Sequence, residues 1–234
     1  MKKMTAFLVA ALVLYGSVGT VLAADKFSAG NREPVQMLGD SMMKFPGEHL
    51  KRQFSLRGIQ ADTFALIGTG VARLDMFDWM GKIDELLRNN QPKVAVVSLG
   101  ANDRQDIRAV NGVLSVGTPE WTAEYAARIG NVMDRLVAGG VKHIIWLKLP
   151  PMRDAPMQTF SDQINRTVAE QAATRPQVII YDFSKLITNP KGGYTETVMD
   201  RRTHKAIKVR DSDGIHLTAE SARMLSVDLV DTYW

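Results

Sequence analysis

The chain has 234 residues, of which 45% are hydrophobic and 23% charged, and this composition is typical of one globular domain with a sizeable core. Cysteine is absent, which excludes disulfide bonds, cysteine metal ligands and a thiol nucleophile. The formal net charge is +4, and it falls to +2 without Lys2 and Lys3, which belong to the leader described next. So small a charge gives no indication of nucleic-acid binding.

The N-terminus has the pattern of a secretory signal. Two lysines precede an apolar run from Ala6 to Leu14, and small residues follow up to Ala23. The pattern predicts a signal peptide over residues 1–23, cleaved after Ala23. An uncleaved membrane anchor would need about 20 apolar residues, and this run is shorter. We therefore expect a periplasmic or secreted protein without a stable membrane span, with a short leader at 24–33 and a single domain at 34–234.

Apolar runs then alternate with segments of helical periodicity. The runs are Val35–Leu38, Ala61–Ile67, Val94–Leu99, His143–Leu149 and Val178–Phe183. The helical segments are Met42–Gln53, Asp78–Asn89, Trp121–Ala138, Phe160–Thr174 and Ala219–Thr232. Several runs are rich in Val and Ile and nearly continuous, as is typical of parallel strands buried on both faces. The alternation predicts an α/β fold in which one parallel sheet has helices on both faces.

The polar loops of this predicted sheet fall where its ligands would bind. Ligands of such sheets sit beyond the carboxyl ends of the strands. The loops after the first four runs read "GDS", "GTGVAR", "GAND" and "PPMR", and "RDSDGIHLT" precedes the last helix. We therefore expect the chemistry of the protein to come from these five segments.

Ser41 lies at the start of the first predicted helix, where a serine is either a helix cap or a nucleophile. A serine nucleophile needs a histidine base and a group that orients this base. His216 is the best placed histidine, because Asp213 can fold back onto its Nδ1 and leave Nε2 facing the serine. Alternatively, Asp213 is a turn residue and His216 only precedes the last helix. Packing or solvated roles are expected for the other histidines, His49, His143 and His204.

Acyl transfer through a serine nucleophile also forms an oxyanion, which needs hydrogen-bond donors. The sequence offers three such donors. The side-chain amide of Asn102 donates without adding charge, and the backbone N–H of Ser41 lies at a helix start. A glycine of the second loop can supply a further backbone N–H, and both Gly70 and Gly68 qualify. We interpret the neighbouring carboxylates, Asp40 and Asp103, as residues that fix loops through backbone hydrogen bonds.

These blocks resemble a known superfamily. Gly39-Asp40-Ser41, the glycine of the second loop, Gly100-x-Asn102-Asp103 and Asp213-x-x-His216 are similar, in this order, to the four blocks of the SGNH (GDSL-like) hydrolases. The resemblance spans nearly the whole chain after the leader. It implies a three-layer α/β/α sandwich with a parallel, flavodoxin-like sheet of about five strands and no cofactor. The stretches "GTGVARLDMFDW", "LPPMR" and "RDSDGIHLT" together resemble those of an exported bacterial subgroup of this superfamily.

The resemblance also implies roles for individual residues. Ser41 would be the nucleophile, His216 the base and Asp213 its partner. Ser41, Asn102 and a glycine would form the oxyanion hole. The second block lacks the usual Asn-x-Gly context, and Gly70 is preferred over Gly68.

Other interpretations of the polar residues are weaker. A carboxylate pair for glycoside hydrolysis would leave the serine and histidine unexplained, and an isolated Asp-x-x-His without further clustered ligands predicts no metal site. Arg73 and Arg153, in the second and fourth loops, could bind an anionic or sugar substrate, although solvated or salt-bridged roles are favoured. The basic segment Asp200 to Asp211 and the flanking "YTETVM" predict a small hairpin, and this segment is expected to wall one side of the pocket.

Together these patterns predict an exported serine esterase. Its substrate would be a small-molecule or glycan ester, such as an O-acetyl group on a carbohydrate of the cell envelope. Two alternatives remain open: an O-acyltransferase that uses the same triad on an envelope glycan, and a non-catalytic glycan-binding protein. Hydrolase and transferase differ only in whether water is excluded from the acyl-enzyme.

Overall fold

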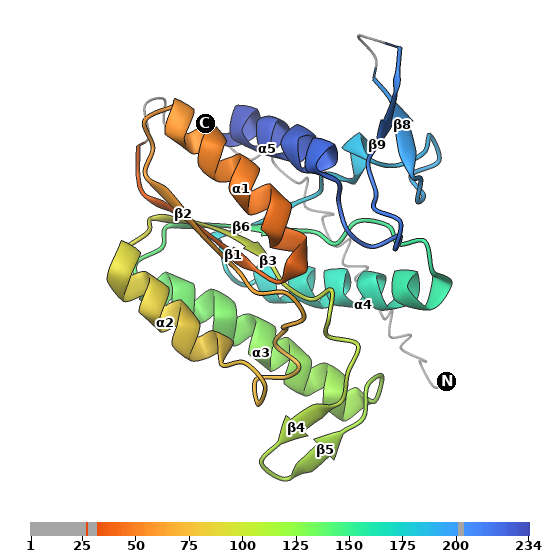
Figure 1. Ribbon diagram of the computed structural model, residues 1–234. Coiled ribbons are helices and arrows are strands. Elements are labelled where there is room, and N and C mark those ends of the chain that lie inside the picture. The colour runs from red at the N-terminus through yellow and green to blue at the C-terminus, as the bar shows by residue number, and fades with distance from the viewer. Residues whose placement is uncertain (1–26, 28–31, 201–203) are drawn as a thin grey trace, which may run out of the picture.

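A computed structural model of the chain describes residues 27, 32–200 and 204–234 (Figure 1). The predicted signal peptide, residues 1–23, and most of the predicted leader lie outside the described residues. Within the described part of the chain, no helix is long and apolar enough to cross a membrane.

The core of the fold is one parallel sheet. Its strands are β1 (Val35–Gly39), β2 (Ala61–Ala65), β3 (Val94–Ser98), β6 (His143–Leu147) and β7 (Val178–Tyr181). They lie in the order β2-β1-β3-β6-β7, and every neighbouring pair is parallel. This is the strand order of flavodoxin-like folds, in which the chain changes direction beside β1. The predicted fold class is therefore confirmed.

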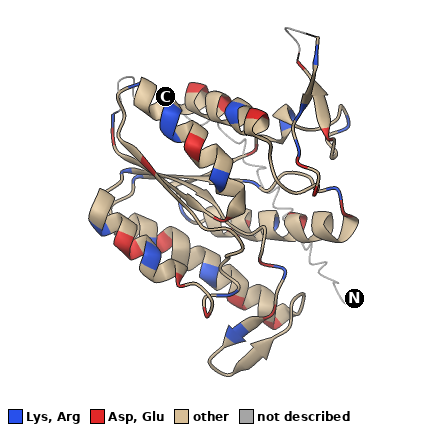
Figure 2. Ribbon diagram, viewed as in Figure 1, with Lys and Arg blue, Asp and Glu red and all other residues tan. Residues whose placement is uncertain are grey.

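Five helices cover the two faces of this sheet. They are α1 (Ser41–Leu56), α2 (Trp79–Asn90), α3 (Pro119–Ala138), α4 (Ala155–Ala172) and α5 (Ala219–Tyr233). In Figure 1, α1 and α5 lie side by side on one face, and α2, α3 and α4 cover the other. Figure 2 shows basic and acidic residues interspersed along these helices. The three layers match the sandwich that the resemblance implies.

Burial explains why these sequences form these layers. All five residues of β3 are buried, because helices cover both faces of the sheet there. Met42 and Met43 pack into the core from α1, and Trp79 is fully buried at the start of α2. These three side chains are part of the hydrophobic core.

Two differences from the predicted elements have local causes. Helix α4 begins at Ala155 rather than Phe160, because Asp154 caps it and its carboxylate accepts a hydrogen bond of 3.0 Å from the N–H of Met157. The antiparallel pair β4 (Ile107–Ala109) and β5 (Gly112–Leu114) was not predicted. Three-residue strands are too short to show an alternating pattern.

The hairpin predicted in the basic segment is present. Its strands are β8 (Thr197–Met199) and β9 (Ala206–Lys208), which pair antiparallel beside α5 (Figure 1). A short 3-10 helix, η1 (Ser184–Leu186), follows β7.

Gly39, the last residue of β1, allows an unusually close approach of the chain. A Cβ atom at this position would lie 2.1 Å from the carbonyl oxygen of Ser98 on β3 and 2.8 Å from the Cβ of Met43. The next residue, Asp40, donates its N–H to the same Ser98 oxygen at 3.0 Å. The end of β1 and the start of α1 are therefore packed directly against the end of β3.

We expect Gly39→Ala to lower the free energy of unfolding by about 2 kcal/mol, because the methyl group would force the backbone of β3 to move. Urea unfolding followed by circular dichroism measures this change. Gly193→Ala is the matched control, since its Cβ would meet only the side-chain amide of Asn189 at 3.2 Å. Equal unfolding midpoints for the two variants would contradict the steric argument.

Candidate active site

Ser41 is the first residue of α1, and it is not the cap of this helix. The cap is Asp40, whose carboxylate accepts the N–H of Met42 at 2.8 Å. The interpretation of Ser41 as a mere helix cap is therefore wrong. Because the helix starts immediately after β1, the serine lies at the carboxyl end of a central strand.

The structure brings Ser41, His216 and Asp213 together. The His216 Nε2 lies 2.8 Å from the Ser41 Oγ, and the His216 Nδ1 lies 2.5 Å from the Asp213 Oδ2. The contacts predicted from the spacing of Asp213 and His216 are therefore present. They assign the Nδ1–H to the bond with the carboxylate, so that Nε2 can accept the serine proton.

The Asp213 carboxylate is also held by the backbone of its own loop. Its Oδ1 accepts the N–H groups of Ile215 at 2.8 Å and His216 at 3.0 Å. Burial acts to raise the pKa of Asp213, but the hydrogen bonds from the His216 ring and from these two N–H groups outweigh it and lower the pKa to about 2. Asp213 thus carries its negative charge at neutral pH and can stabilise an imidazolium on His216.

The other three histidines lie outside this arrangement. The ring of His143 stacks on Phe27 with the ring centroids 4.4 Å apart, which confirms a packing role. Desolvation by burial lowers the pKa of His143. His49 is half-buried on α1, and His204 is exposed beside β9.

The expected oxyanion donors come from the loops after β2 and β3. The Asn102 Nδ2 donates to the carbonyl of Thr69 at 3.0 Å, and its second N–H is a further donor. Gly70 is buried against Asp103, and a Cβ there would lie 2.0 Å from the Asp103 Oδ1. Gly68 is exposed, and a Cβ there would meet no described atom within 4 Å. This packing favours Gly70, although its role and that of Asn102 stay predictions.

The two buried carboxylates fix these loops, as expected. Asp40 accepts the N–H of Met42 with one oxygen and the N–H groups of Gly100 and Ala101, each at 3.1 Å, with the other. Burial raises the pKa of Asp40 to about 7, and these N–H groups act in the opposite direction. One carboxylate therefore joins the serine turn to the loop after β3.

Asp103 plays the same part between the second and third loops. It accepts the N–H of Ala72 and the hydroxyl of Tyr125, both at 2.9 Å. Burial raises the pKa of this carboxyl as well, and the hydrogen bonds from Ala72 and Tyr125 oppose the effect. The carboxylate holds the loop that carries Gly70 against the loop that carries Asn102.

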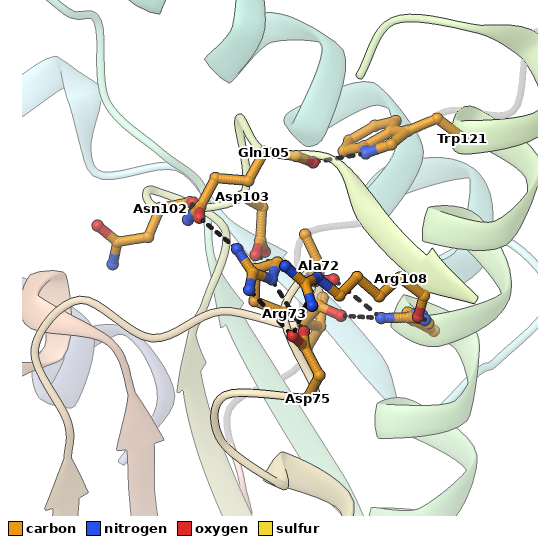
Figure 3. Close-up of polar contacts among 10 residues, drawn as sticks. Ala72, Arg73, Asp75, Asn102, Asp103, Gln105, Arg108 and Trp121 are labelled. Atoms are coloured by element: carbon orange, nitrogen blue, oxygen red, sulfur yellow. Dashed lines mark hydrogen bonds and ion pairs between the residues drawn. The ribbon is translucent and has the colours of Figure 1, made fainter. Parts of the chain in front are cut away.

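Arg73 belongs to a polar network rather than to an open cationic site (Figure 3). Its guanidinium forms two hydrogen bonds of 2.9 Å with Asp75 and reaches the side-chain oxygen of Gln105 at 3.4 Å. Gln105 in turn donates to the backbone carbonyl of Asn102 at 2.6 Å. In Figure 3 the Asn102 side chain points away from Arg73. The salt-bridged interpretation of Arg73 is thus the one the structure supports.

Sequence reasoning missed Gln105 and Trp121 as supports of the third loop. The indole N–H of Trp121 donates to the Gln105 carbonyl at 2.8 Å, and Gln105 holds Asn102 as described above. A glutamine three residues after Asn102 is the only trace of this contact in the sequence. No local pattern connects it with a tryptophan on α3.

Arg153 lies beside the loop of Asp213 and His216. Its guanidinium is half-exposed and forms an ion pair of 3.5 Å with Glu196, and its side chain packs against Gly214, where a Cβ would meet it at 2.6 Å. A role of Arg153 in substrate binding stays a prediction.

The β8–β9 hairpin lines a groove of about 1040 Å³ together with η1 and α5. The residues that line this groove include none of Ser41, Asp213 and His216. This groove is therefore separate from the three residues, and the expectation that the hairpin walls the catalytic pocket stays a prediction. Among the residues that the structure describes, no group of three His, Asp or Glu side chains could hold a metal ion.

Comparison with known protein families identifies the family of this chain. The chain matches, over residues 34–232, the family described as "protein of unknown function (DUF459)". It belongs to the DUF459 family. No curated protein matches this DUF459 chain.

Solved structures similar to this DUF459 protein share its fold. A protein assigned as an SGNH hydrolase from Slackia heliotrinireducens matches with a TM-score of 0.56 and 17% identity, over 86% of this chain and 99% of that chain. A catalytic mutant of an acetylxylan esterase from Geobacillus stearothermophilus matches with a TM-score of 0.57 and 15% identity, over 88% of this chain and 96% of that chain. A family 3 carbohydrate esterase from Clostridium thermocellum matches with a TM-score of 0.53 and 14% identity, over 86% of this chain and 98% of that chain. The predicted SGNH hydrolase fold is thereby confirmed.

We expect Asp213→Asn to lower kcat on 4-nitrophenyl acetate by roughly 10²- to 10⁴-fold, because an amide neither balances an imidazolium nor fixes the tautomer of His216. Steady-state kinetics on folded protein measure this loss. Asp211→Asn is the control on the same loop, since the Asp211 backbone contacts remain. A similar loss in both variants would show that any change in this loop disturbs the site.

The value of kcat/KM for an ester substrate should rise with pH between about pH 5 and 8, the range in which histidines usually titrate. The buried Asp40 carboxyl, whose pKa is raised to about 7, titrates in the same range. Asp213 should add no step there: its depressed pKa of about 2 keeps it ionised, and its charge is lost only as the pH falls toward 2. The dependence of kcat/KM on pH measures this. A rate that stays flat from about pH 5 to 8 would contradict a histidine base.

Proposed function

We propose that this protein is a serine esterase that cleaves O-acyl ester bonds with Ser41 as nucleophile, His216 as base and Asp213 as the partner of the base. The observation that carries the proposal is the unbroken series of contacts from Asp213 through His216 to Ser41, at 2.5 and 2.8 Å. A helix start and a turn explain each residue alone, but neither explains why all three side chains converge.

The geometry supports an acyl-enzyme mechanism. As the Ser41 Oγ attacks the ester carbonyl carbon, its proton passes to the His216 Nε2, and the carbonyl becomes a tetrahedral oxyanion. The intermediate collapses when the His216 Nε2 returns the proton to the leaving alcohol. Water, deprotonated by His216, then attacks the acyl-enzyme, releases the carboxylic acid and restores Ser41.

Charge stabilisation in this mechanism falls to the three loop donors. The Ser41 N–H lies at the first turn of α1, where the helix dipole favours an anion. The second N–H of Asn102 and the N–H of Gly70 complete the proposed oxyanion hole. Each such donor contributes about 3 kcal/mol to transition-state stabilisation in comparable sites.

Exposure of the triad supports hydrolysis over acyl transfer. The side chains of His216 and Asp213 are 35% and 42% exposed. Water therefore has access to the base that would activate it, whereas a transferase must keep water from its acyl-enzyme.

For the substrate we propose an O-acetyl or other O-acyl ester on a carbohydrate, in the periplasm or outside the cell. The predicted signal peptide supports export. Two proteins of similar fold are described as an acetylxylan esterase and a carbohydrate esterase, and this supports the substrate class by likeness of fold alone.

We expect a fluorophosphonate to add once to the wild-type protein, because it traps a serine that has an adjacent base. Ser41→Ala should remove the adduct, and His216→Ala should slow its formation strongly. Intact-mass spectrometry measures both. Ser212→Ala, on the exposed loop beside Asp213, is the serine control and should react like the wild type.

Absence of an adduct in folded wild-type protein would overturn the proposal and favour the glycan-binding alternative. An adduct that persists in Ser41→Ala would show that another residue is the reactive one.

A further inference from the structure

Arg210 is a buried cation next to the proposed catalytic loop. Its side chain is 1% exposed, and no carboxylate of the described residues forms an ion pair with it. Its Nε and Nη1 are buried without a hydrogen-bond partner in the described part of the chain. Burial lowers the pKa of Arg210 to about 10, which still leaves it charged at neutral pH. Placing a charge inside a protein is costly, and the negative charge of Asp213 opposes part of this cost, since it acts to raise the pKa of Arg210.

The one nitrogen of Arg210 with hydrogen bonds joins two loops. Its Nη2 donates to the carbonyl of Pro151 at 2.8 Å and to the carbonyl of Gly214 at 3.3 Å. The guanidinium also lies over the ring of Tyr194, with its carbon 5.5 Å from the ring centroid. These contacts fix the guanidinium between the loop after β6 and the loop before α5.

The Gly214 carbonyl belongs to the peptide group that holds the catalytic carboxylate. This peptide group also contains the N–H of Ile215, which donates to the Asp213 Oδ1 at 2.8 Å. A trans peptide group is planar, and its carbonyl and N–H point in opposite directions. Fixing the Gly214 carbonyl on Arg210 therefore fixes the direction of the Ile215 N–H toward Asp213. A cation on the carbonyl also polarises the peptide group and strengthens the bond made by its N–H.

The backbone of Arg210 closes the same loop at its base. Arg210 and Leu217 form an antiparallel bridge, and the N–H of Asp211 donates to the carbonyl of His216 at 2.8 Å. Gly214, at the tip, has a φ of +77°, a conformation that glycine adopts readily. The loop is thus held at its base by the main chain. At its tip, the Gly214 carbonyl accepts both the Arg210 side chain and the backbone N–H of Arg153, each at 3.3 Å.

We propose that Arg210 is a positioning residue for the proposed esterase: through the Gly214–Ile215 peptide group it orients Asp213 and, through Asp213, His216 toward Ser41. This inference rests on the proposed function. Arg210 acts through a peptide group, and none of its hydrogen bonds in the described part of the chain reaches Ser41.

Arg210→Met tests the proposal, because methionine fills much of the same space without the charge or the donors. We expect kcat on 4-nitrophenyl acetate to fall by roughly 10- to 100-fold, since small displacements of catalytic groups have effects of this size. KM should change by less than about twofold, because no contact with substrate is lost. Arg210→Lys keeps the charge and can reach one carbonyl, and it should recover part of the lost rate.

Two readouts separate positioning from a general effect on stability. In an Asp213→Asn background, Arg210→Met should lower kcat by less than about threefold, because the group through which Arg210 acts is already impaired. The downfield proton NMR signal of the His216 Nδ1–H should broaden or vanish in Arg210→Met and return in part in Arg210→Lys. This signal reports the contact of His216 with Asp213 and does not require catalysis.

Arg175→Met is the matched control. Arg175 also donates to a backbone carbonyl, that of Gln171, at 2.6 Å. It precedes β7 and so lies near the amino ends of the strands, whereas the catalytic loop lies at their carboxyl ends. Its replacement should leave kcat and the His216 signal unchanged.

The outcomes separate this inference from the proposed function. A folded Arg210→Met that keeps both the wild-type kcat and the His216 signal would overturn the positioning role, as would equal losses of kcat in the wild-type and Asp213→Asn backgrounds. If Arg210→Met fails to fold, the same comparisons of kcat and of the His216 signal on Arg210→Lys test the positioning role instead. If the wild type forms no fluorophosphonate adduct, the proposed function fails, and the NMR signal still shows whether Arg210 orients the pair.

Discussion

The site depends on the hydrogen bonds that the buried Asp40 carboxylate accepts from two segments of the backbone. With one oxygen it accepts the N–H of Met42 in the first turn of α1, and with the other it accepts the N–H groups of Gly100 and Ala101 after β3. The loops of the proposed nucleophile and of one oxyanion donor are therefore tied to one buried group at the carboxyl ends of β1 and β3. Its position follows from the direct passage of β1 into α1, which Gly39 permits by leaving room for the Ser98 carbonyl.

Asp103 extends this arrangement outward, and the two carboxylates differ from the one in the triad. Both are fully buried, and burial raises the pKa of each. Asp213 is partly exposed, and its hydrogen bonds hold its pKa low at about 2. Carboxylates that fix loops and the carboxylate that supports a base thus occupy opposite environments, although all three accept backbone N–H groups.

Much of the fold and the centre of the site could be predicted from the sequence, because the signals are local. Apolar runs mark the strands, and Asp213 and His216 lie within one turn of each other. The supports of the site could not be predicted, since they join residues that are distant in the chain. Arg210 reaches Pro151 across 59 positions, and Trp121 reaches Gln105 from another element. A basic segment is ordinarily solvent-exposed, so its composition gave no sign that Arg210 is buried.

The proposed nucleophile and base also differ in what surrounds them. Ser41 is anchored where a buried strand becomes a buried helix, whereas His216 stands on an exposed loop that a few hydrogen bonds hold in place. Local opening is easiest where exposed backbone bonds are many and buried contacts are few. Separation of His216 from Ser41 can therefore occur as a small, reversible event while the sheet stays intact. The alignment of the proposed triad then depends on the stability of one loop and not on that of the whole domain.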